Sequence, residues 1–132
     1  MGLDAYGVTV AVEFAGDCQV DIVYKDENDR PYAAADVNAY FAHWKNFYQL
    51  QDWMGALYAE KSGDDGCFNN NTVRLTLADL ARLEAALQTT EFAAMGDGDE
   101  IEAESMADTL DFIQRAREAI ASGYAVFYDC WW

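Results

Sequence analysis

The sequence predicts an α+β fold in which three to four helices cover a small, mostly antiparallel sheet. Three observations support it: alternating apolar residues near the N-terminus, apolar residues at helical spacing through the middle, and an apolar stretch at the C-terminus. We expect the sheet to contain an N-terminal hairpin, a short middle strand and a C-terminal strand. Because 132 residues is a usual size for one domain, residues 1–132 are expected to form a single domain.

Two alternating stretches predict the N-terminal hairpin. Apolar residues alternate with mostly polar or small ones from Val8 to Phe14 and again from Val20 to Tyr24, with Gly16 between them. This alternation is typical of two paired strands with one buried face. The polar stretch Lys25–Pro31 follows and contains the only proline of the chain, so it predicts a turn.

The middle of the chain predicts helical structure. Large apolar residues recur at helical spacing from about Ala33 to Tyr48, and the pattern continues as far as Ser62 and Gly63, which are expected to stop it. We expect one long bent helix or two consecutive helices. The spaced residues are Val37, Tyr40, Phe41, Trp44, Tyr48, Leu50, Trp53, Met54 and Leu57.

A loop, a strand and a capped helix are expected next. Ser62–Asn71 has the composition of a loop, and Thr72–Leu75 is a candidate for a short strand. Thr76 and Asp79 fit a capping box, in which each side chain bonds the backbone N–H of the other residue. The helix that follows is expected to bury a leucine stripe. This stripe consists of Leu77, Leu80, Leu83 and Leu87.

The last third predicts a connection, a helix and a strand. Gln88–Glu104 has weak periodicity and predicts a long surface connection. Gly123 is well placed to end the helix that follows. Tyr124–Trp132 is apolar in both alternating sets except at Asp129, which is typical of a central strand covered on both sides. The spaced residues of the helix are Met106, Leu110, Ile113 and Ile120.

The composition argues against several kinds of protein. A net charge of −16 disfavours direct binding to nucleic acid or to an anionic membrane surface, because both require lysine and arginine. We expect no membrane-spanning helix, since no window approaches the roughly 18 apolar residues required. We also expect no standard secretion signal, since no positively charged segment followed by an apolar run opens the chain. Cys18, Cys67 and Cys130 are odd in number and lack C-x-x-C spacing, so reduced thiols and a cytoplasmic location are expected.

The stretch GDGDEIEAES, from Gly96 to Ser105, contains five carboxylates and no base. Nine acids and no lysine or arginine lie between Arg82 and Arg115, and their mutual repulsion costs stability. That cost favours a role in binding a basic partner. The candidate partner-binding residues are Asp97, Asp99, Glu100, Glu102, Glu104, Asp108 and Asp111.

The net charge is of the order needed to mimic nucleic acid. A compact chain of this length is about 35 Å across, and duplex DNA of that length bears about 20 phosphate charges. Three alternatives to mimicry stay open: the acids could serve only solubility, they could reflect a salt-adapted source, or an aromatic surface could make the contact. The candidates for an aromatic surface are Tyr58, Phe68, Tyr124 and Trp131.

Catalytic and metal sites have little support in the sequence. Cys67 could act as a nucleophile with His43, the only histidine, as its base, but the two residues share no local signature. Counted from Asp97, a calcium loop would have Ile101 at its fifth position and Asp108 at its twelfth, which does not fit. An irregular Ca²⁺ or Mg²⁺ site stays open. We expect no enzymatic activity and no cofactor.

Three stretches of the chain resemble a family of small phage and prophage proteins. The stretches are Trp44–Lys61, Cys67–Leu87 and Asp108–Trp132, and they cover roughly the last two thirds of the chain in colinear order. Typical members carry the motifs W-M-x-x-L-Y, F-N-C, L-T-x-x-D-L-x-x-L-E and Y-Y-D-S-W-W. This chain differs from them at Asn70, in place of the cysteine, and at Cys130, in place of the serine.

The resemblance implies a phage or prophage origin rather than a reaction. Members often bear the label phosphoglycerate kinase, but this small chain has no glycine cluster before a helix that could cradle a phosphate. We therefore expect a non-enzymatic accessory protein in the host-cell cytoplasm. It would bind a basic surface of a host protein, for example as an acidic nucleic-acid mimic or an inhibitor of host defence. The alternative is a small protein-interaction or assembly module that uses an aromatic surface.

Overall fold

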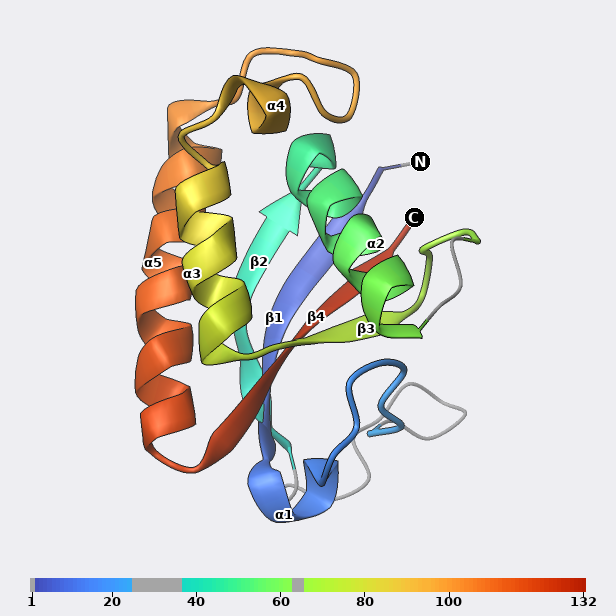
Figure 1. The fold of residues 1–132 in the computed structure, drawn as a ribbon, viewed down its shortest axis with the longest axis vertical. Coiled ribbons are helices and arrows are strands. Elements are labelled where there is room, and N and C mark those ends of the chain that lie inside the picture. Colours follow the sequence, from blue (N-terminus) through green and yellow to red (C-terminus); the bar gives the residue numbers. More distant parts are fainter. Residues whose placement is uncertain (1, 25–36, 63–65) are drawn as a thin grey trace.

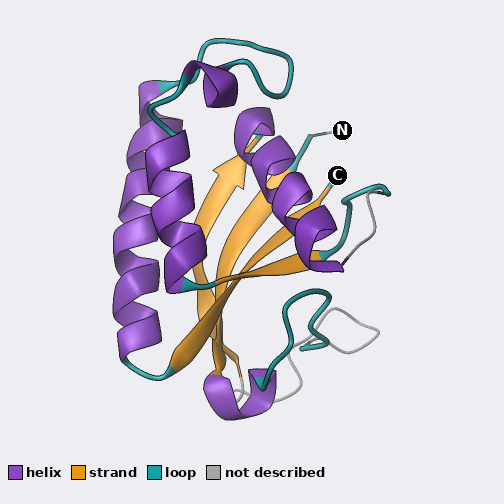
Figure 2. Ribbon diagram, viewed as in Figure 1, coloured by secondary structure: helices purple, strands orange, loops and turns teal. Residues whose placement is uncertain are grey.

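The chain folds into a four-stranded antiparallel sheet with helices packed against it (Figures 1 and 2). A computed structural model describes residues 2–24, 37–62 and 66–132. The predicted α+β class, with a small sheet covered by helices, is confirmed. The elements in chain order are β1 (Asp4–Ala11), α1 (Val12–Ala15), β2 (Val37–Lys45), α2 (Tyr48–Ser62), β3 (Thr72–Leu75), α3 (Leu77–Ala86), α4 (Thr90–Ala93), α5 (Ala103–Ala121) and β4 (Tyr124–Trp131).

The strand order is β2-β1-β4-β3, so the C-terminal strand is central as predicted. Strand β4 pairs with β1 along its whole length, from Asp4 opposite Trp131 to Ala11 opposite Tyr124. Its other edge pairs with β3, which confirms the predicted short strand Thr72–Leu75. The tail is buried from Ala125 to Cys130, whereas Tyr124 is half-buried and the last two tryptophans are exposed.

The predicted N-terminal hairpin is wrong. Strand β1 ends at Ala11, and residues predicted to extend it form the helical turn α1. From Val20 to Tyr24 the chain forms no strand, and its backbone instead runs along the outer edge of β3 through a bridge between Val20 and Val73. Local alternation indicates a half-buried segment but does not identify its partner, which here lies far away in the sequence. The turn predicted at Lys25–Pro31 lies outside the described residues.

The helix predicted from Ala33 to Tyr48 is also wrong over Val37–Lys45, because these residues form strand β2. Residues 33–36 of this prediction lie outside the described residues. The register of β1 and β2 shifts between Gly7 and Val8, and Phe41 is the residue that the shift leaves unmatched. The irregularity brings Phe41 onto the side of the sheet where Trp44 lies, and both rings contact Phe112 of α5, with centroids 5.4 and 4.9 Å from it. An irregular strand thus produces the three-residue spacing that resembles a helix.

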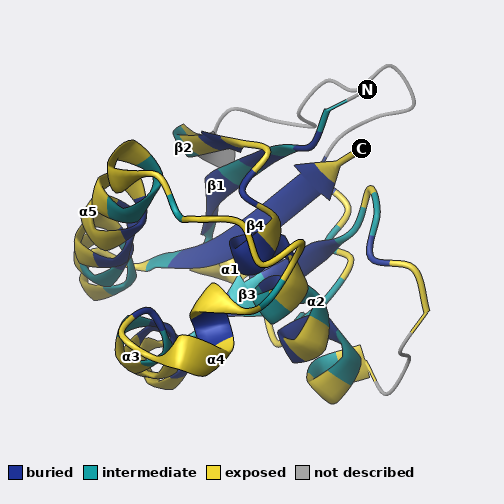
Figure 3. Cartoon of the chain, turned by 90° about the horizontal axis from the view of Figure 1, so that it is seen from above, coloured by how far each residue is buried: buried dark blue, intermediate teal, exposed yellow. Residues whose placement is uncertain are grey.

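The larger core lies between the sheet and helices α2, α3 and α5 (Figure 3). Helix α5 comes so close to β1 that a Cβ atom at Gly7 would lie 2.7 Å from the ring of Phe112. The opposite face of the sheet has a smaller core, to which α1 and Tyr24 contribute. The fully buried residues of the larger core include Leu50, Met54, Val73, Leu75, Leu80, Leu83, Val126 and Tyr128.

The predictions for the other helices are largely confirmed. Helix α2 ends at Ser62, α3 begins at the capping box of Thr76 and Asp79, and Gly123 follows α5 with a φ of 94°. Leu77 and Leu110 are exposed rather than buried, because each faces away from the sheet on its helix. The other three leucines of the predicted stripe are buried.

The connection Gln88–Glu104 contains the short helix α4, which the sequence did not predict. Its Phe92 is buried against Phe47, with ring centroids 6.0 Å apart, so this connection is fastened to the core. In the described part of the chain, no helix combines the length and apolar character needed to cross a membrane.

Candidate binding surface

The acids predicted to bind a partner all lie exposed, on one loop and one helix. The loop follows α4, crosses the end of the molecule and leads directly into α5 (Figure 1). We call these residues the acidic surface. Its loop members are Asp97, Asp99, Glu100 and Glu102, and its helix members are Glu104, Asp108 and Asp111.

The sequence of α5 explains why its acids face outward. Glu104, Asp108 and Asp111 are four and three residues apart, so they project from the same side of the helix. The residues that α5 buries against the sheet and α3 lie on the opposite side. They are Thr109, Phe112, Ile113 and Ala116.

The acidic loop is fastened to the first turns of α2. The backbone N–H of Gly96 donates to Asp52 Oδ2 at 2.8 Å, and Gln49 Nε2 donates to the carbonyl of Asp99 at 2.6 Å. Gly96 has a φ of 60°, and a Cβ atom there would lie 2.8 Å from the Cβ of Tyr48. These contacts position the backbone of the loop and leave its carboxylates facing solvent.

Basic side chains of the described residues pair mostly with acids outside the acidic surface. Arg82 pairs with Glu60 and Arg117 pairs with Glu84, both at 3.1 Å, and each arginine lowers the pKa of its partner. Within the acidic surface, Asp111 has an ion pair, with Arg115 at 3.7 Å. Among the described residues the other six acids of the surface have none.

The aromatic surface considered as an alternative is smaller than the sequence suggested. Tyr58 and Phe68 are buried, and Tyr124 is half-buried. Trp131 is 54% exposed, and Trp132, which was not among the candidates, is 47% exposed. Of the four candidate aromatic residues, Trp131 is therefore the exposed one, and Trp132 follows it at the end of the chain.

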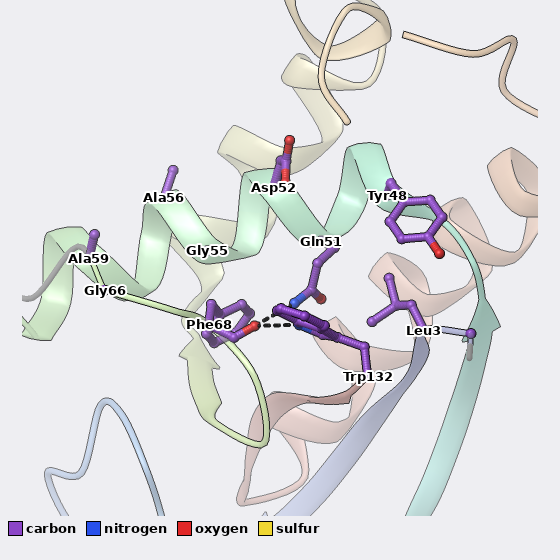
Figure 4. A pocket seen from close by; sticks show the side chains of 11 residues that line it. Leu3, Tyr48, Gln51, Asp52, Gly55, Ala56, Ala59, Gly66, Phe68 and Trp132 are labelled. Atoms are coloured by element: carbon purple, nitrogen blue, oxygen red, sulfur yellow. Dashed lines mark hydrogen bonds between the residues drawn. The ribbon is translucent and has the colours of Figure 1, made fainter. Parts of the chain in front are cut away.

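A cavity of about 710 Å³ lies beside α2, next to Trp132 (Figure 4). The carbonyl of Phe68 accepts hydrogen bonds from Trp132 Nε1 at 3.0 Å and from Gln51 Nε2 at 2.9 Å, which fixes the indole at the edge of the cavity. Gly55, Ala56 and Ala59 of α2 are small and leave the space open. We call this space the α2 cavity; its wall opposite the helix includes Leu3, Phe68 and Trp132.

The sequence did not reveal the α2 cavity. Its lining comes from the N-terminus, α2, the loop that contains Gly66 and Phe68, and the end of β4. The one local signal was the small residues Gly55, Ala56 and Ala59 between larger apolar ones on a predicted helix. Small side chains on one face of a helix leave space next to that face. The pattern does not show which residues lie on the other side of the space.

The structure does not place Cys67 against His43. His43 Nε2 lies 3.0 Å from Asp4 Oδ1, and its ring stacks on Tyr6, while Cys67 is exposed in the loop after α2. Within residues 2–24, 37–62 and 66–132, no group of three or more His, Cys, Asp or Glu side chains could hold a metal ion.

Two buried acids stabilise the fold and lie apart from the acidic surface. Lys61 Nζ lies 2.6 Å from Asp79 Oδ2. Burial alone raises the pKa of Asp79, but hydrogen bonds from Lys61 and Thr76 outweigh it and hold this pKa below its usual value. Asp129 accepts a hydrogen bond from Tyr24, and burial, together with the charge of Asp129, raises the pKa of Tyr24.

Comparison of the chain with family models, curated proteins and solved structures gave no match. The resemblance to the phage and prophage family therefore stays a prediction. What the chain binds has to be argued from the acidic surface and the α2 cavity.

Proposed function

We propose that the chain is a non-enzymatic phage or prophage accessory protein whose acidic surface binds a basic surface of a host protein. The observation that carries the proposal is the exposure of all seven acids on an anchored loop and one side of a helix. Exposed carboxylates that lack nearby bases create a strong negative potential, which attracts basic partners and speeds their association.

A nucleic-acid site is the kind of basic surface that fits best. Such sites carry lysine and arginine residues that neutralise the closely spaced negative phosphates of DNA. The net charge of −16 is comparable with the roughly 20 phosphate charges on a duplex of similar length. A partner that binds the acidic surface through such a site should be displaced both by salt and by duplex DNA. The protein would then act as a nucleic-acid mimic.

A second candidate function is an interaction module that uses aromatic side chains. The exposure of Trp131 and Trp132 favours it, because large exposed aromatic residues are enriched in interfaces. In this case the acids would serve only solubility. Binding would then be insensitive to salt, which distinguishes the two candidates.

The test is affinity capture from a nuclease-treated bacterial lysate, with two matched variants of the immobilised chain. The first, Glu100→Gln with Glu102→Gln, removes two charges from the acidic surface. The second, Glu13→Gln with Asp17→Asn, removes two exposed charges elsewhere. Captured proteins are eluted with increasing salt or with duplex DNA and then identified by mass spectrometry.

We expect the original chain and the Glu13/Asp17 variant to capture the same nucleic-acid-binding proteins, and the Glu100/Glu102 variant to lose them. These proteins should elute with salt and with DNA. Equal capture by all three chains, or capture that salt and DNA do not reverse, would refute the proposal. Loss of capture after Trp131→Ala, with salt-insensitive elution, would instead support the aromatic module.

A further inference from the structure

The α2 cavity has the size and the lining of a binding site. Its volume of about 710 Å³ lies within the roughly 300–1,000 Å³ typical of ligand sites. Leu3, Phe68 and Trp132 supply apolar surface on one side, and Gly55, Ala56 and Ala59 leave room on the other (Figure 4). A large apolar side chain from another molecule could therefore bury most of its surface here.

The charge at the cavity is negative. Asp52 lines it and is exposed, and none of the described lining residues is a lysine or arginine. The other polar side chains in the wall have partners within the chain. Gln51 Nε2 donates to the carbonyl of Phe68 and its Oε1 accepts from Tyr128 at 2.8 Å, Trp132 Nε1 donates to the same carbonyl, and the hydroxyl of Tyr48 donates to Asn46 Oδ1 at 3.3 Å. Asp52 is thus the one charged side chain among the described lining residues.

The cavity and the acidic surface adjoin each other. Asp52 lines the cavity and accepts the hydrogen bond from Gly96, the residue at which the acidic loop begins. Tyr48 also lines the cavity, and its Cβ packs closely against Gly96. A segment that lies in the cavity can therefore extend past Gly96 to the carboxylates of Asp97 and Asp99.

We propose that the α2 cavity and the acidic loop form one binding site for a peptide segment in which a large apolar side chain lies next to lysine or arginine residues. This inference rests on the proposed function, since the segment would belong to the same basic partner. The apolar side chain enters between α2 and Trp132, and the basic residues face Asp52 and the loop acids.

Charge complementarity favours a basic peptide segment over a second copy of the chain, an acidic ligand or a neutral apolar ligand as the occupant of the site. A second copy of the chain would bring another −16 against the acidic loop, and an acidic ligand would be repelled in the same way. A neutral apolar ligand could fill the cavity but would leave the adjoining acids without a counterpart. A basic segment with an apolar anchor satisfies both parts of the site.

The test uses three labelled 12-residue peptides and fluorescence anisotropy, with the indole N–H signal of Trp132 followed by NMR. The first peptide combines leucine and lysine, the second replaces each leucine by serine, and the third replaces each lysine by glutamate. They are measured against the original chain and against Ala56→Phe, which fills the cavity. Ala81→Phe, on the exposed side of α3, is the matched control.

We expect the leucine–lysine peptide to bind at least tenfold more tightly than the serine–lysine peptide, because one buried leucine is sufficient for that difference. The glutamate peptide should not bind measurably. Ala56→Phe should abolish the preference for leucine and the shift of the Trp132 signal, whereas Ala81→Phe should preserve both.

Equal binding of the first two peptides, an unchanged preference in Ala56→Phe, or no binding of the leucine–lysine peptide would each overturn the inference. The Glu100→Gln, Glu102→Gln variant separates this failure from failure of the proposed function. If both lysine peptides bind equally but lose affinity in that variant, the acidic surface binds a basic partner without the cavity. If the variant binds the leucine–lysine peptide as the original chain does, the proposed role of the acids fails as well.

Discussion

Lys61 Nζ lies 2.6 Å from Asp79 Oδ2, and this ion pair ties the last turn of α2 to the capping box of α3. The lysine also donates to Gln19 Oε1 at 3.0 Å and to the carbonyl of Arg74 at 2.6 Å. Both charged side chains are largely buried. One carboxylate thus caps a helix and neutralises a buried ammonium group.

Asp79→Asn should lower the free energy of unfolding by about 1–3 kcal/mol, because it weakens the helix cap and leaves the charge of Lys61 without its carboxylate. Urea denaturation followed by circular dichroism measures this loss. The control is Glu60→Gln, which removes an exposed pair with Arg82 and should change the stability little. Similar losses in the two variants would contradict the role given to Asp79.

The same residue predicts a dependence on pH. Because the pKa of Asp79 is lowered in the folded state, its stabilising contribution is complete above the unfolded-state pKa of about 3.9. That contribution is lost as the pH falls through the lowered folded-state value. The difference in unfolding free energy between the original chain and Asp79→Asn should be constant from about pH 7 to 5 and shrink below about pH 4. A difference that persists unchanged at pH 2 would contradict the lowered pKa.

Two glycines of the acidic loop give a matched test of its attachment to α2. Gly96 and Gly98 have φ values of 60° and 70°, so alanine at either position costs about 1 kcal/mol of backbone strain. At Gly96 the new Cβ would also lie 2.8 Å from Tyr48 and 3.0 Å from the backbone nitrogen of Gln49. At Gly98 the nearest atom is 4.0 Å away.

Gly96→Ala should therefore lower the melting temperature more than Gly98→Ala. It should also speed amide hydrogen exchange in the loop, because the bond from Gly96 to Asp52 is lost. Hydrogen exchange followed by mass spectrometry measures the second effect. Equal effects of the two substitutions would show that the loop is not held against α2.

The position of each acid decides what its charge does to stability. Glu102 and Glu104 lie at the start of α5, where negative charge stabilises a helix, whereas Asp99 and Glu100 lie in the loop before it. Asp99→Asn with Glu100→Gln should relieve repulsion and raise the melting temperature slightly. Glu102→Gln with Glu104→Gln should lower it.

Both of these double variants should associate more slowly with a basic partner, such as the leucine–lysine peptide, at low salt. Stopped-flow fluorescence measures the rate, and the differences should fade as the ionic strength approaches 1 M. An unchanged association rate in both variants would show that these acids do not steer the partner.

Strong local signals were sufficient to predict much of this fold. The capping box of Thr76 and Asp79 places the start of α3 because its two hydrogen bonds form between residues three apart. The apolar run Tyr124–Trp132 predicts a central strand because only a strand with neighbours on both edges and cover on both faces buries both alternating sets. In each case the signal in the sequence lies within a few residues.

The remainder depends on contacts between distant residues. Strand β2 was missed because its register irregularity places Phe41 and Trp44 against Phe112, a spacing that a helix would also produce. The acidic surface was predictable because clustered carboxylates are almost always exposed. The α2 cavity was not, because Leu3, Phe68 and Trp132 become neighbours only when the sheet has formed.

The central position of β4 also has a kinetic consequence. Its pairing with β1 joins Asp4 to Trp131, and such contacts close almost the whole chain into one loop before they contribute any stability. Helices α3 and α5 can form early from local contacts, but the sheet around which they pack cannot. We therefore expect refolding to be slow for a chain of this length, with the pairing of β1 and β4 as the step that limits the rate.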